Sequence, residues 1–508
     1  RQMFEAGGWV LVESAIADLP ADLRWLFESG AVTLEQLTAI QRSLGVTSVA
    51  DLAAAVGERA LGTVEGVGPQ VEGAVAAALP LLRMSIPRIP LGRATAVAEP
   101  VLAALRTVPG VRWAYTTGSL RRGQDTVGDI EIVASTVDPE PAMAQVISLG
   151  DGGRWLHRSD RRIYILSDRV QVGVRLPAPE HAGADLLYLT GSPAHFAVLQ
   201  AYASGAGWRL AAGGLYGHDG HLRPAATEED IYATLGLPCI PPEIRTGDDE
   251  IDAAKHGALP TLVSRRDICG DLHMHTTWSD GRDSVEAMVE TCRALGYRYL
   301  AITDHSPHSA ATRNLSIDGV KRQAEEIAEV RSRYPEIAVL HGCEVDILPD
   351  GRLDFPDRVL ERFDIVLASL HERAGQPPDQ LMKRYVGAMR HPLVTLITHP
   401  TNRMVPHKRG YDLDYDRLFA IATETRTIVE IDGSPSHLDL DGALARRAIA
   451  AGTTVAIDSD CHRAEMLDRQ MQLGIVTARR GWVEARHVLN TRPLEEVRAL
   501  IAAKRASR

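Results

Sequence analysis

From about residue 266 to the end of the chain, short apolar runs alternate with amphipathic stretches of helical length. The runs, such as YLAITDH, AVLHGCE and IVLASLH, are rich in aliphatic and β-branched residues and end in polar ones. Runs of this kind are typical of parallel strands buried on both faces, and the amphipathic stretches are typical of the helices that join them. The pattern therefore predicts a parallel α/β barrel in residues 266–508.

Three other zones precede this barrel. Residues 1–94 are rich in Ala, Leu and Val with helical periodicity, which predicts a helical region. Residues 95–245 predict mixed α and β structure, with a hairpin in RIYILSDRVQVGVRL that turns at the SDR triplet. Residues 246–265 contain Gly, Asp and Pro without strong periodicity, which indicates a linker.

Side chains that can bind metals close most of the apolar runs in the barrel zone. A strand has a period of two, so the HMH sequence places both of its imidazoles on one face. An isolated histidine at a strand end is more often an ordinary core or surface residue, but that explanation must be repeated independently at every strand. Because the carboxyl ends of parallel barrel strands meet on one face, we expect one shared site. The nine candidate ligands are His273, His275, Asp280, His305, Glu344, His371, His399, Asp460 and His462.

The type and number of these ligands indicate the chemistry. Mixed imidazole and carboxylate ligands suit Zn, Mn or Fe rather than Ca. Nine ligands exceed what one ion can use, so two or three divalent ions are predicted. Closely spaced ions clamp the attacking and leaving oxygens in phosphoester hydrolysis. The barrel zone therefore predicts a metal-dependent phosphoesterase.

A glycine turn in the helical region is a candidate contact with DNA. In GTVEGVGPQVEG, Gly66 and Gly68 form a tight turn before an apolar helix. Backbone N–H groups at such a turn can bind a DNA phosphate. The same turn is equally common as a plain connection between helices, so the sequence leaves both interpretations open.

The mixed zone contains TTGSLRRGQDTVGDIEIVAS, which combines a small turn with an acidic strand. Gly118, Ser119 and Arg122 form a donor-rich turn that suits a phosphate tail. Asp129 and Glu131 are two residues apart in a strand-like run, so their carboxylates share a face and can hold Mg²⁺. A turn beside a solvated acidic strand is the plainer alternative.

Composition and charge limit the number of domains, the cellular compartment and the way in which the chain can bind nucleic acid. A chain of 508 residues with 45% hydrophobic content can hold two to four domains. No apolar run reaches about 18 residues and no signal-peptide pattern is visible, so we expect neither a membrane span nor secretion. The five cysteines form no CxxC pair, which favours a reducing cytoplasm. The net charge of −11 argues against binding nucleic acid by bulk charge, although local phosphate contacts stay open.

Taken together, these motifs resemble those of a bacterial family X DNA polymerase with a C-terminal PHP (polymerase and histidinol phosphatase) domain. The polymerase side is carried by GSLRRGQDTVGDIEIV, DLLYLTGSPAHF and TEEDIYATLGLPCIPPEIR, and the PHP side by the nine ligands. The resemblance implies a multidomain protein of α+β and α/β type that binds DNA. It implies a helix-hairpin-helix region in 1–94, a nucleotidyltransferase palm and thumb in 95–245, and a seven-stranded (β/α)7 PHP barrel in 266–508.

The resemblance also implies a trinuclear centre. By that analogy one ion would be held by His273, His275, Glu344 and Asp460. Glu344 would bridge to a second ion, held by His371 and His399. A third ion would be held by Asp280, His305 and His462.

On the polymerase side the chain departs from the family pattern. Of the three palm aspartates that hold Mg²⁺ in the family, Asp129 is present, the second is Glu131, and the third position is Gly173. Phe196 and Gln200 replace an Asn and an Arg of the nucleotide-pocket motif. Loss of activating carboxylates slows such reactions strongly. We therefore expect a vestigial Mg²⁺ site, with dNTP binding retained and nucleotidyl transfer impaired.

The function expected from these features is 3′–5′ exonuclease or 3′-end processing in DNA repair, on gapped DNA or free 3′ ends. Two alternatives stay open: an active gap-filling polymerase with 3′–5′ exonuclease, and a small-molecule phosphatase of the histidinol-phosphatase type. Arg373 and Arg403 are candidate phosphate contacts, although solvated arginines are the plainer interpretation. No lysine precedes Lys255 and the first helix-hairpin-helix segment of the family is not recognised, so no Schiff-base lyase is expected.

Overall fold

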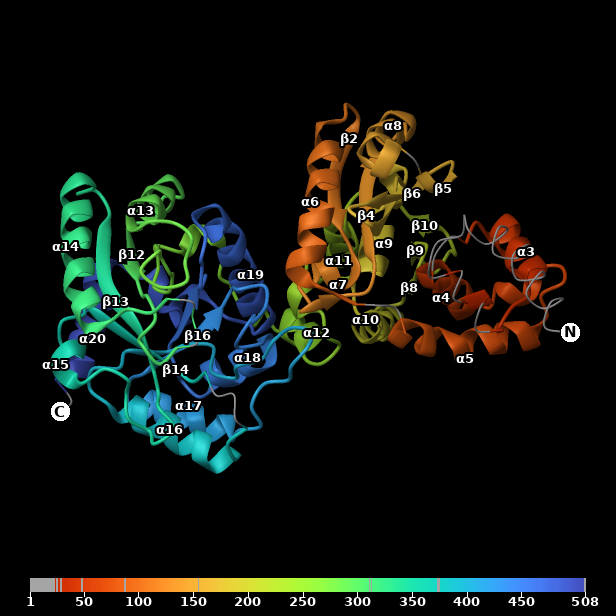
Figure 1. The fold of residues 1–508 in the computed structure, drawn as a ribbon. Coiled ribbons are helices and arrows are strands. Elements are labelled where there is room, and N and C mark those ends of the chain that lie inside the picture. The colour runs from red at the N-terminus through yellow and green to blue at the C-terminus, as the bar shows by residue number, and fades with distance from the viewer. Residues whose placement is uncertain are drawn as a thin grey trace, which may run out of the picture. The chain divides into compact units, whose positions relative to one another are not determined.

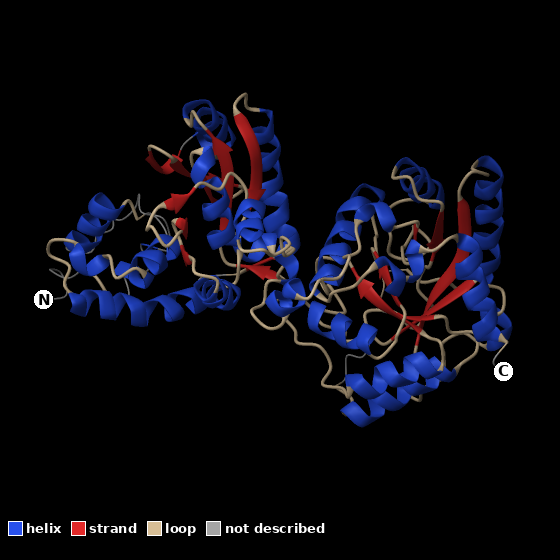
Figure 2. Cartoon of the chain, turned by 180° about the vertical axis from the view of Figure 1, so that it is seen from behind, coloured by secondary structure: helices blue, strands red, loops and turns tan. Residues whose placement is uncertain are grey.

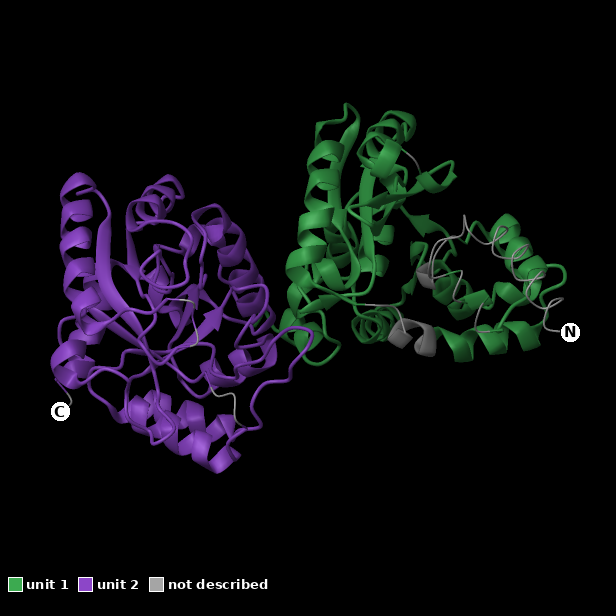
Figure 3. Ribbon diagram, in the orientation of Figure 1, with its two compact units in different colours: residues 1–259 green, residues 260–508 purple. Residues whose placement is uncertain are grey.

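The computed structural model describes residues 30–46, 49–85, 88–153, 155–309, 313–371 and 375–506, together with residues 23, 26, 27 and 311. The chain divides into two compact units, Arg1–Leu259 and Pro260–Arg508 (Figure 3). The boundary between them falls inside the predicted linker. Side chains of residues 49, 50 and 80–85 lie outside the described part.

The first part of unit 1 is helical, as its periodicity predicts. Its helices enclose a small apolar core that includes Leu37, Ile40 and Val75. The first of them begins with a capping box, in which the Thr33 hydroxyl accepts from the N–H of Gln36 and the Gln36 side chain accepts from the N–H of Thr33. The helices are α3 (Leu34–Leu44), α4 (Val49–Gly57) and α5 (Pro69–Ser85).

A five-stranded sheet of strand order β2-β4-β7-β6-β5 forms the middle of unit 1. The predicted hairpin is confirmed: β6 and β7 pair antiparallel, and Asp168 and Arg169 between them both have positive φ, as a two-residue hairpin turn of the I′ type requires. The strands are β2 (Val111–Thr116), β4 (Ile130–Thr136), β5 (Trp155–Ser159), β6 (Arg162–Ser167) and β7 (Val170–Arg175), and the short pair is β1 (Ile89–Pro90) and β3 (Thr126–Val127). The helices are α6 (Leu91–Thr107), α7 (Gly118–Arg121) and α8 (Glu140–Leu149).

Helices and a small three-stranded sheet complete unit 1. The first part of the predicted linker is folded, because it contains helix α12 (Glu250–Lys255). Glu250 is fully buried, and its Oε1 lies 2.6 Å from Nδ1 of His195. The elements are α9 (Pro179–Thr190), α10 (Pro193–Gly205), β8 (Arg209–Ala211), β9 (Gly214–Tyr216), β10 (Leu222–Arg223), α11 (Glu228–Thr234) and α12 (Glu250–Lys255).

Unit 2 is built on seven strands that follow one another in chain order, and every neighbouring pair is parallel. An isolated parallel bridge between Met274 and Cys461 brings the segment after the last strand beside the segment after the first, so the sheet nearly closes. The predicted (β/α)7 barrel is confirmed. The strands are β11 (Gly270–Asp271), β12 (Tyr299–Ile302), β13 (Ala338–Asp346), β14 (Ile365–Ser369), β15 (Leu396–Ile397), β16 (Ile428–Asp432) and β17 (Val455–Asp458).

Helices lie outside these strands, as Figure 1 and the reverse view in Figure 2 show. Ser284 and Ser316 cap the first two long helices by accepting a backbone N–H. The helices are α13 (Val285–Ala294), α14 (Ile317–Arg333), α15 (Asp357–Leu360), α16 (Pro378–Arg390), α17 (Tyr415–Glu424), α18 (Gly442–Ala450), α19 (Leu467–Arg480) and α20 (Leu494–Arg505). Within the described residues, no helix combines the length and the apolar character needed to cross a membrane.

Candidate metal centre and palm pocket

The nine candidate ligands lie where the barrel strands end. Met274 is fully buried in the apolar core, so its neighbours His273 and His275 point to the opposite side, with ring centroids 5.0 Å apart. The ligands are His273, His275 and Asp280 after β11, His305 after β12, Glu344 in β13, His371 after β14, His399 after β15, and Asp460 and His462 after β17.

Glu344 is the centre of the cluster and is 1% exposed. Its Oε2 lies 2.9 Å from Nδ1 of His305, 3.4 Å from Nε2 of His273 and 3.6 Å from Nε2 of His275. Its Oε1 lies 2.9 Å from Nε2 of His399. A single buried carboxylate that faces imidazoles on both oxygens has the geometry of a bridging ligand.

The ligand atoms form overlapping groups within 4.8 Å of one another. The groups are His275, Asp280, His305 and His462; His273, His275 and Asp460; and His305, Glu344 and His371. With His399 joined through Glu344, all nine predicted ligands come together. His275 and His305 each belong to two groups, so the assignment of ligands to individual ions stays a prediction.

The donor atoms fit divalent metal ions. Nε2 of His273 and Nε2 of His275 lie 3.1 Å apart, although two facing ring nitrogens can share only one proton. Oδ1 of Asp280 is buried without a hydrogen bond of good geometry, with Nε2 of His462 at 3.4 Å. Such contacts are unfavourable without a partner, and a cation between the donors removes the conflict. The set therefore suits ions that accept both imidazole and carboxylate.

Two of the ligands have strained backbones. His399 has a φ of 25° and Asp460 a φ of 48°, in the region that favours glycine. Such residues typically cost about 1–3 kcal/mol each and persist where the surrounding structure holds them. Strain at two ligand positions supports a functional rather than a purely structural role for these side chains.

The imidazoles differ in their pKa values. Burial, followed by repulsion from neighbouring imidazoles, lowers the pKa of His275 to about 3. Burial also opposes charge on His399, but its hydrogen bond to Glu344 and the carboxylate charge raise the pKa to about 9. Burial of His462 is likewise outweighed by Asp280, and its pKa rises to about 9. An ion that binds the last two must displace protons, so metal binding should release protons.

Buried carboxylates behind the ligands were not predicted from the sequence. Oε1 of Glu430 lies 2.6 Å from Nδ1 of His273, and Oε2 accepts the backbone N–H of His399 at 2.6 Å. Oδ1 of Asp346 lies 2.9 Å from Nδ1 of His371. A carboxylate on the second ring nitrogen fixes the orientation and tautomer of a metal-binding imidazole. The signal in the sequence was the pair of acidic residues inside the apolar run IVEID.

Glu430→Gln is expected to lower the affinity for Mn²⁺ about 10- to 100-fold, because the partner of the His273 ring loses its charge. The measurement is competition with a fluorescent chelator. Glu495→Gln, at an exposed position of α20, is the matched control and should bind like the wild type. Equal affinities in Glu430→Gln and the control would show that Glu430 does not position the ligand.

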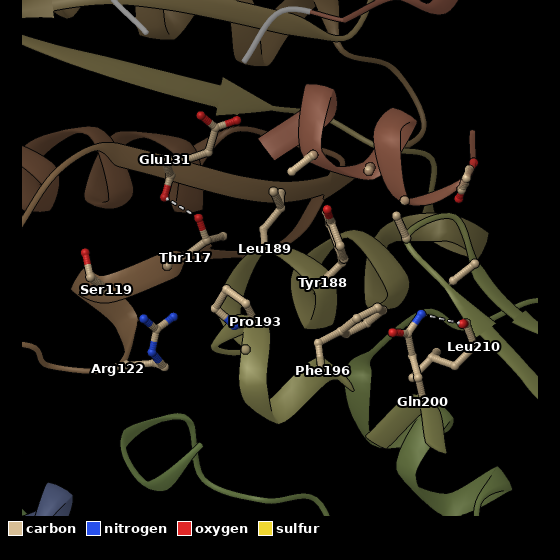
Figure 4. A pocket seen from close by; sticks show the side chains of 18 of the residues that line it. Thr117, Ser119, Arg122, Glu131, Tyr188, Leu189, Pro193, Phe196, Gln200 and Leu210 are labelled. Atoms are coloured by element: carbon tan, nitrogen blue, oxygen red, sulfur yellow. Dashed lines mark hydrogen bonds between the residues drawn. The ribbon is translucent and has the colours of Figure 1, made fainter. Parts of the chain in front are cut away.

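A separate cavity of about 940 Å³ lies in unit 1 (Figure 4). Its lining includes the five residues predicted to bind phosphate or Mg²⁺, which are Gly118, Ser119, Arg122, Asp129 and Glu131. Nη1 of Arg122 donates to the carbonyl of Thr190 at 2.5 Å, which holds the side chain at the edge of the turn. The predicted phosphate-binding turn is therefore part of a real cavity.

Glu131, the fifth residue of this predicted site, is held in an ion-pair network. Figure 4 shows its carboxylate directed away from Ser119 and Arg122. The carboxylate accepts from Nε of Arg175, whose Nη1 lies 2.5 Å from Oδ1 of Asp51 in α4. Glu131 is 7% exposed. Within the described residues, no group of three metal-binding side chains includes this carboxylate.

Gly173 lies opposite Glu131 in the adjacent strand β7. A Cβ atom at this position would lie 2.6 Å from Oε2 of Glu131 and 2.7 Å from Cε1 of Tyr164. Neither contact is tolerated without movement. The third carboxylate of the family pattern is thus missing, and the space it would need is filled.

Comparison with known proteins identifies the family. The chain is 32% identical over 505 residues to the "DNA polymerase/3'-5' exonuclease PolX" of Bacillus subtilis, and the match covers 99% of this chain and 88% of that protein. The chain belongs to the PolX family. Residues 185–246 match the DNA polymerase beta thumb, and residues 271–424 match the PHP domain.

Relatives of smaller size are named probable phosphatases. Those of Caldanaerobacter subterraneus and of a Thermoanaerobacter species are 28% and 29% identical over 205 residues, 38% of this chain and 75% and 78% of theirs. PHP domains are metal-dependent, in agreement with the clustered ligands in unit 2. The chain is therefore a PolX-family enzyme with a PHP hydrolase domain.

The two residues that depart from the nucleotide-pocket motif of the PolX family, Phe196 and Gln200, line the unit 1 cavity. Phe196 packs edge-on against Tyr188, with ring centroids 5.1 Å apart, and is 8% exposed. The amide of Gln200 donates to the carbonyl of Leu210 at 3.0 Å. An apolar ring and an engaged amide thus replace the polar contacts that the family motif implies.

The remaining predicted contacts have different outcomes. Gly66 and Gly68 are exposed in the turn before α5, and Gly66 has a φ of 79°. Their role in DNA binding stays a prediction. Arg403 donates to the carbonyls of His437 and Leu438, so its guanidinium holds a loop, and the structure gives the predicted phosphate contact no support. Arg373 lies outside the described residues.

Proposed function

We propose that this protein is a metal-dependent phosphoesterase that removes nucleotides from DNA 3′ ends, as a 3′–5′ exonuclease in DNA repair. The observation that carries the proposal is the convergence of nine imidazole and carboxylate ligands around Glu344. The PolX relative named as a 3′-5′ exonuclease supports DNA as the substrate class. We propose two or three ions of Zn, Mn or Fe and a cytoplasmic location, which the five free cysteines support.

The residues of the chain have distinct tasks in this reaction. The ions, when bound, would polarise the scissile phosphate and lower the pKa of a water molecule. Glu344 would contribute an oxygen to each of two adjacent ions, because its two oxygens face different imidazoles. Glu430 and Asp346 orient the rings of His273 and His371.

We propose that the palm binds DNA and dNTP but transfers nucleotides poorly. Asp129 and the Gly118 turn line the cavity, which supports retention of nucleotide binding. Glu131 is engaged by Arg175, and Gly173 supplies no carboxylate at the third position, which supports impaired transfer. The cavity itself favours the alternative of an active gap-filling polymerase, and the probable phosphatases among the relatives favour a small-molecule phosphatase.

A panel of substrates with Mn²⁺ separates these functions. Single-stranded and gapped oligonucleotides with a 5′ label, small phosphomonoesters, and dNTPs with a primed template are tested under the same conditions. Shortening of DNA from the 3′ end without comparable phosphomonoester hydrolysis is the expected result. Hydrolysis of phosphomonoesters alone would instead favour the phosphatase, and efficient gap filling the polymerase.

No Schiff-base lyase activity on 5′-deoxyribose phosphate is expected, because the chain has no lysine before Lys255. Borohydride trapping on an incised abasic substrate is the measurement, with Lys255→Arg as a comparison. A trapped protein–DNA adduct that maps to residues 1–250 would contradict the expectation.

A further inference from the structure

A seventh imidazole and a further carboxylate lie beside the nine-ligand centre. Asp432 is the last residue of β16, and His437 lies in the loop that follows it. Their ligand atoms and one of Asp460 all lie within 4.8 Å of one another. We propose that Asp432, His437 and Asp460 form an additional divalent cation position, which shares Asp460 with the nine-ligand centre.

The ring of His437 presents a lone pair at this position. Its Nδ1 lies 2.9 Å from the carbonyl oxygen of Arg403, which can only accept, so Nδ1 carries the hydrogen. Nε2 of the neutral ring is then free of hydrogen. A neutral imidazole with an accessible lone pair is the form that binds metal ions.

Asp432 supplies an oxygen that lacks a partner. The residue is fully buried, and its Oδ1 accepts the backbone N–H of Ser434 at 2.6 Å. Its Oδ2 is buried and has no hydrogen-bond partner. A buried carboxylate oxygen without a partner is unfavourable. A divalent cation removes this penalty, and a proton on Asp432 is the competing explanation.

Asp460 connects this position to the main centre. Its Oδ1 lies 3.0 Å from Nε2 of His275, and the same residue belongs to the group with Asp432 and His437. A carboxylate has two oxygens and can serve two ions. His437 also stacks on His399, with ring centroids 5.4 Å apart and an angle of 23° between the planes. The additional position is thus an extension of the centre on the His399 side.

Metal stoichiometry tests the proposal without reference to nuclease activity. The full chain is stripped with a chelator, titrated with Mn²⁺ by calorimetry, and passed through a desalting column for elemental analysis. The wild type is expected to bind one equivalent more than Asp432→Asn and one more than His437→Gln. His391→Gln, which lies outside the ligand groups of the described residues, is the control and should match the wild type.

Thermal melting of each metal-free variant establishes that it folds, and Asp432→Asn keeps the size of the side chain. Loss of one equivalent in both variants supports the additional position. Unchanged stoichiometry in both variants overturns it in favour of a protonated Asp432. A loss in only one variant also overturns it, because the three ligands would not act together. Inactive nuclease with the expected stoichiometry would count against the proposed reaction and not against this site.

Discussion

Asp460→Ala is expected to lower Mn²⁺-dependent cleavage of DNA 3′ ends by roughly 100-fold or more. Replacing even the partner of a metal ligand typically costs about 10- to 100-fold, so loss of a direct ligand should reach at least the upper end of that range. Asp460 is 7% exposed, lies 3.0 Å from Nε2 of His275 and shares a ligand group with His273. The measurement is the time course of shortening of a 5′-labelled oligonucleotide.

His273→Ala should have the same effect, because its Nε2 faces both Glu344 and Asp460. Metal content measured beside activity should fall in both variants. His391→Gln removes an imidazole of the same unit outside the centre and should keep wild-type activity. Nuclease activity that survives unchanged in both Asp460→Ala and His273→Ala would place the reaction elsewhere in the protein.

The positions of the nine candidate ligands followed from local rules. The strand period of two placed His273 and His275 on one face, and the shared barrel end placed distant residues together. The turn at Asp168 followed from residue type in the same way. These features depend on one strand or on the shared end of all strands, and both are readable from a single sequence.

The supporting contacts required the folded chain. Glu430 reaches His273, which is 157 residues away in the sequence, and nothing local indicates that pairing. Asp51 and Arg175 lie in different segments of unit 1, so the ion pair that engages Glu131 was not predictable. Gly173 was recognised as a missing carboxylate, but only the structure shows that neighbouring side chains fill its space.

Templated nucleotide addition is expected to be absent or very slow. One metal ion orients the triphosphate and another lowers the pKa of the primer hydroxyl, and loss of the third carboxylate should impair the second task more. Asp129 and Glu131 both line the cavity, but the carboxylate of Glu131 is bound to Arg175. The test is primer extension across a one-nucleotide gap in a His273→Ala background, so that trimming does not mask synthesis. Fluorescent dNTP binding, measured in parallel, should be retained.

Restoring a carboxylate at position 173 tests whether its absence is the cause of slow nucleotide addition. Gly173→Asp alone should fail to raise extension and should destabilise the palm by about 1–3 kcal/mol, because the new Cβ meets Oε2 of Glu131 at 2.6 Å and Cε1 of Tyr164 at 2.7 Å. Glu131→Asp shortens the carboxylate side chain that the new residue meets, and Tyr164→Leu removes the aromatic ring beside it. The rate of primer extension should therefore rise only when these changes are combined with Gly173→Asp. Denaturant unfolding of each variant separates lost stability from lost chemistry. Robust extension by the unaltered palm would show instead that Asp129 and Glu131 suffice for catalysis. In that case the ion pair between Glu131 and Arg175 would have to open when DNA and nucleotide bind.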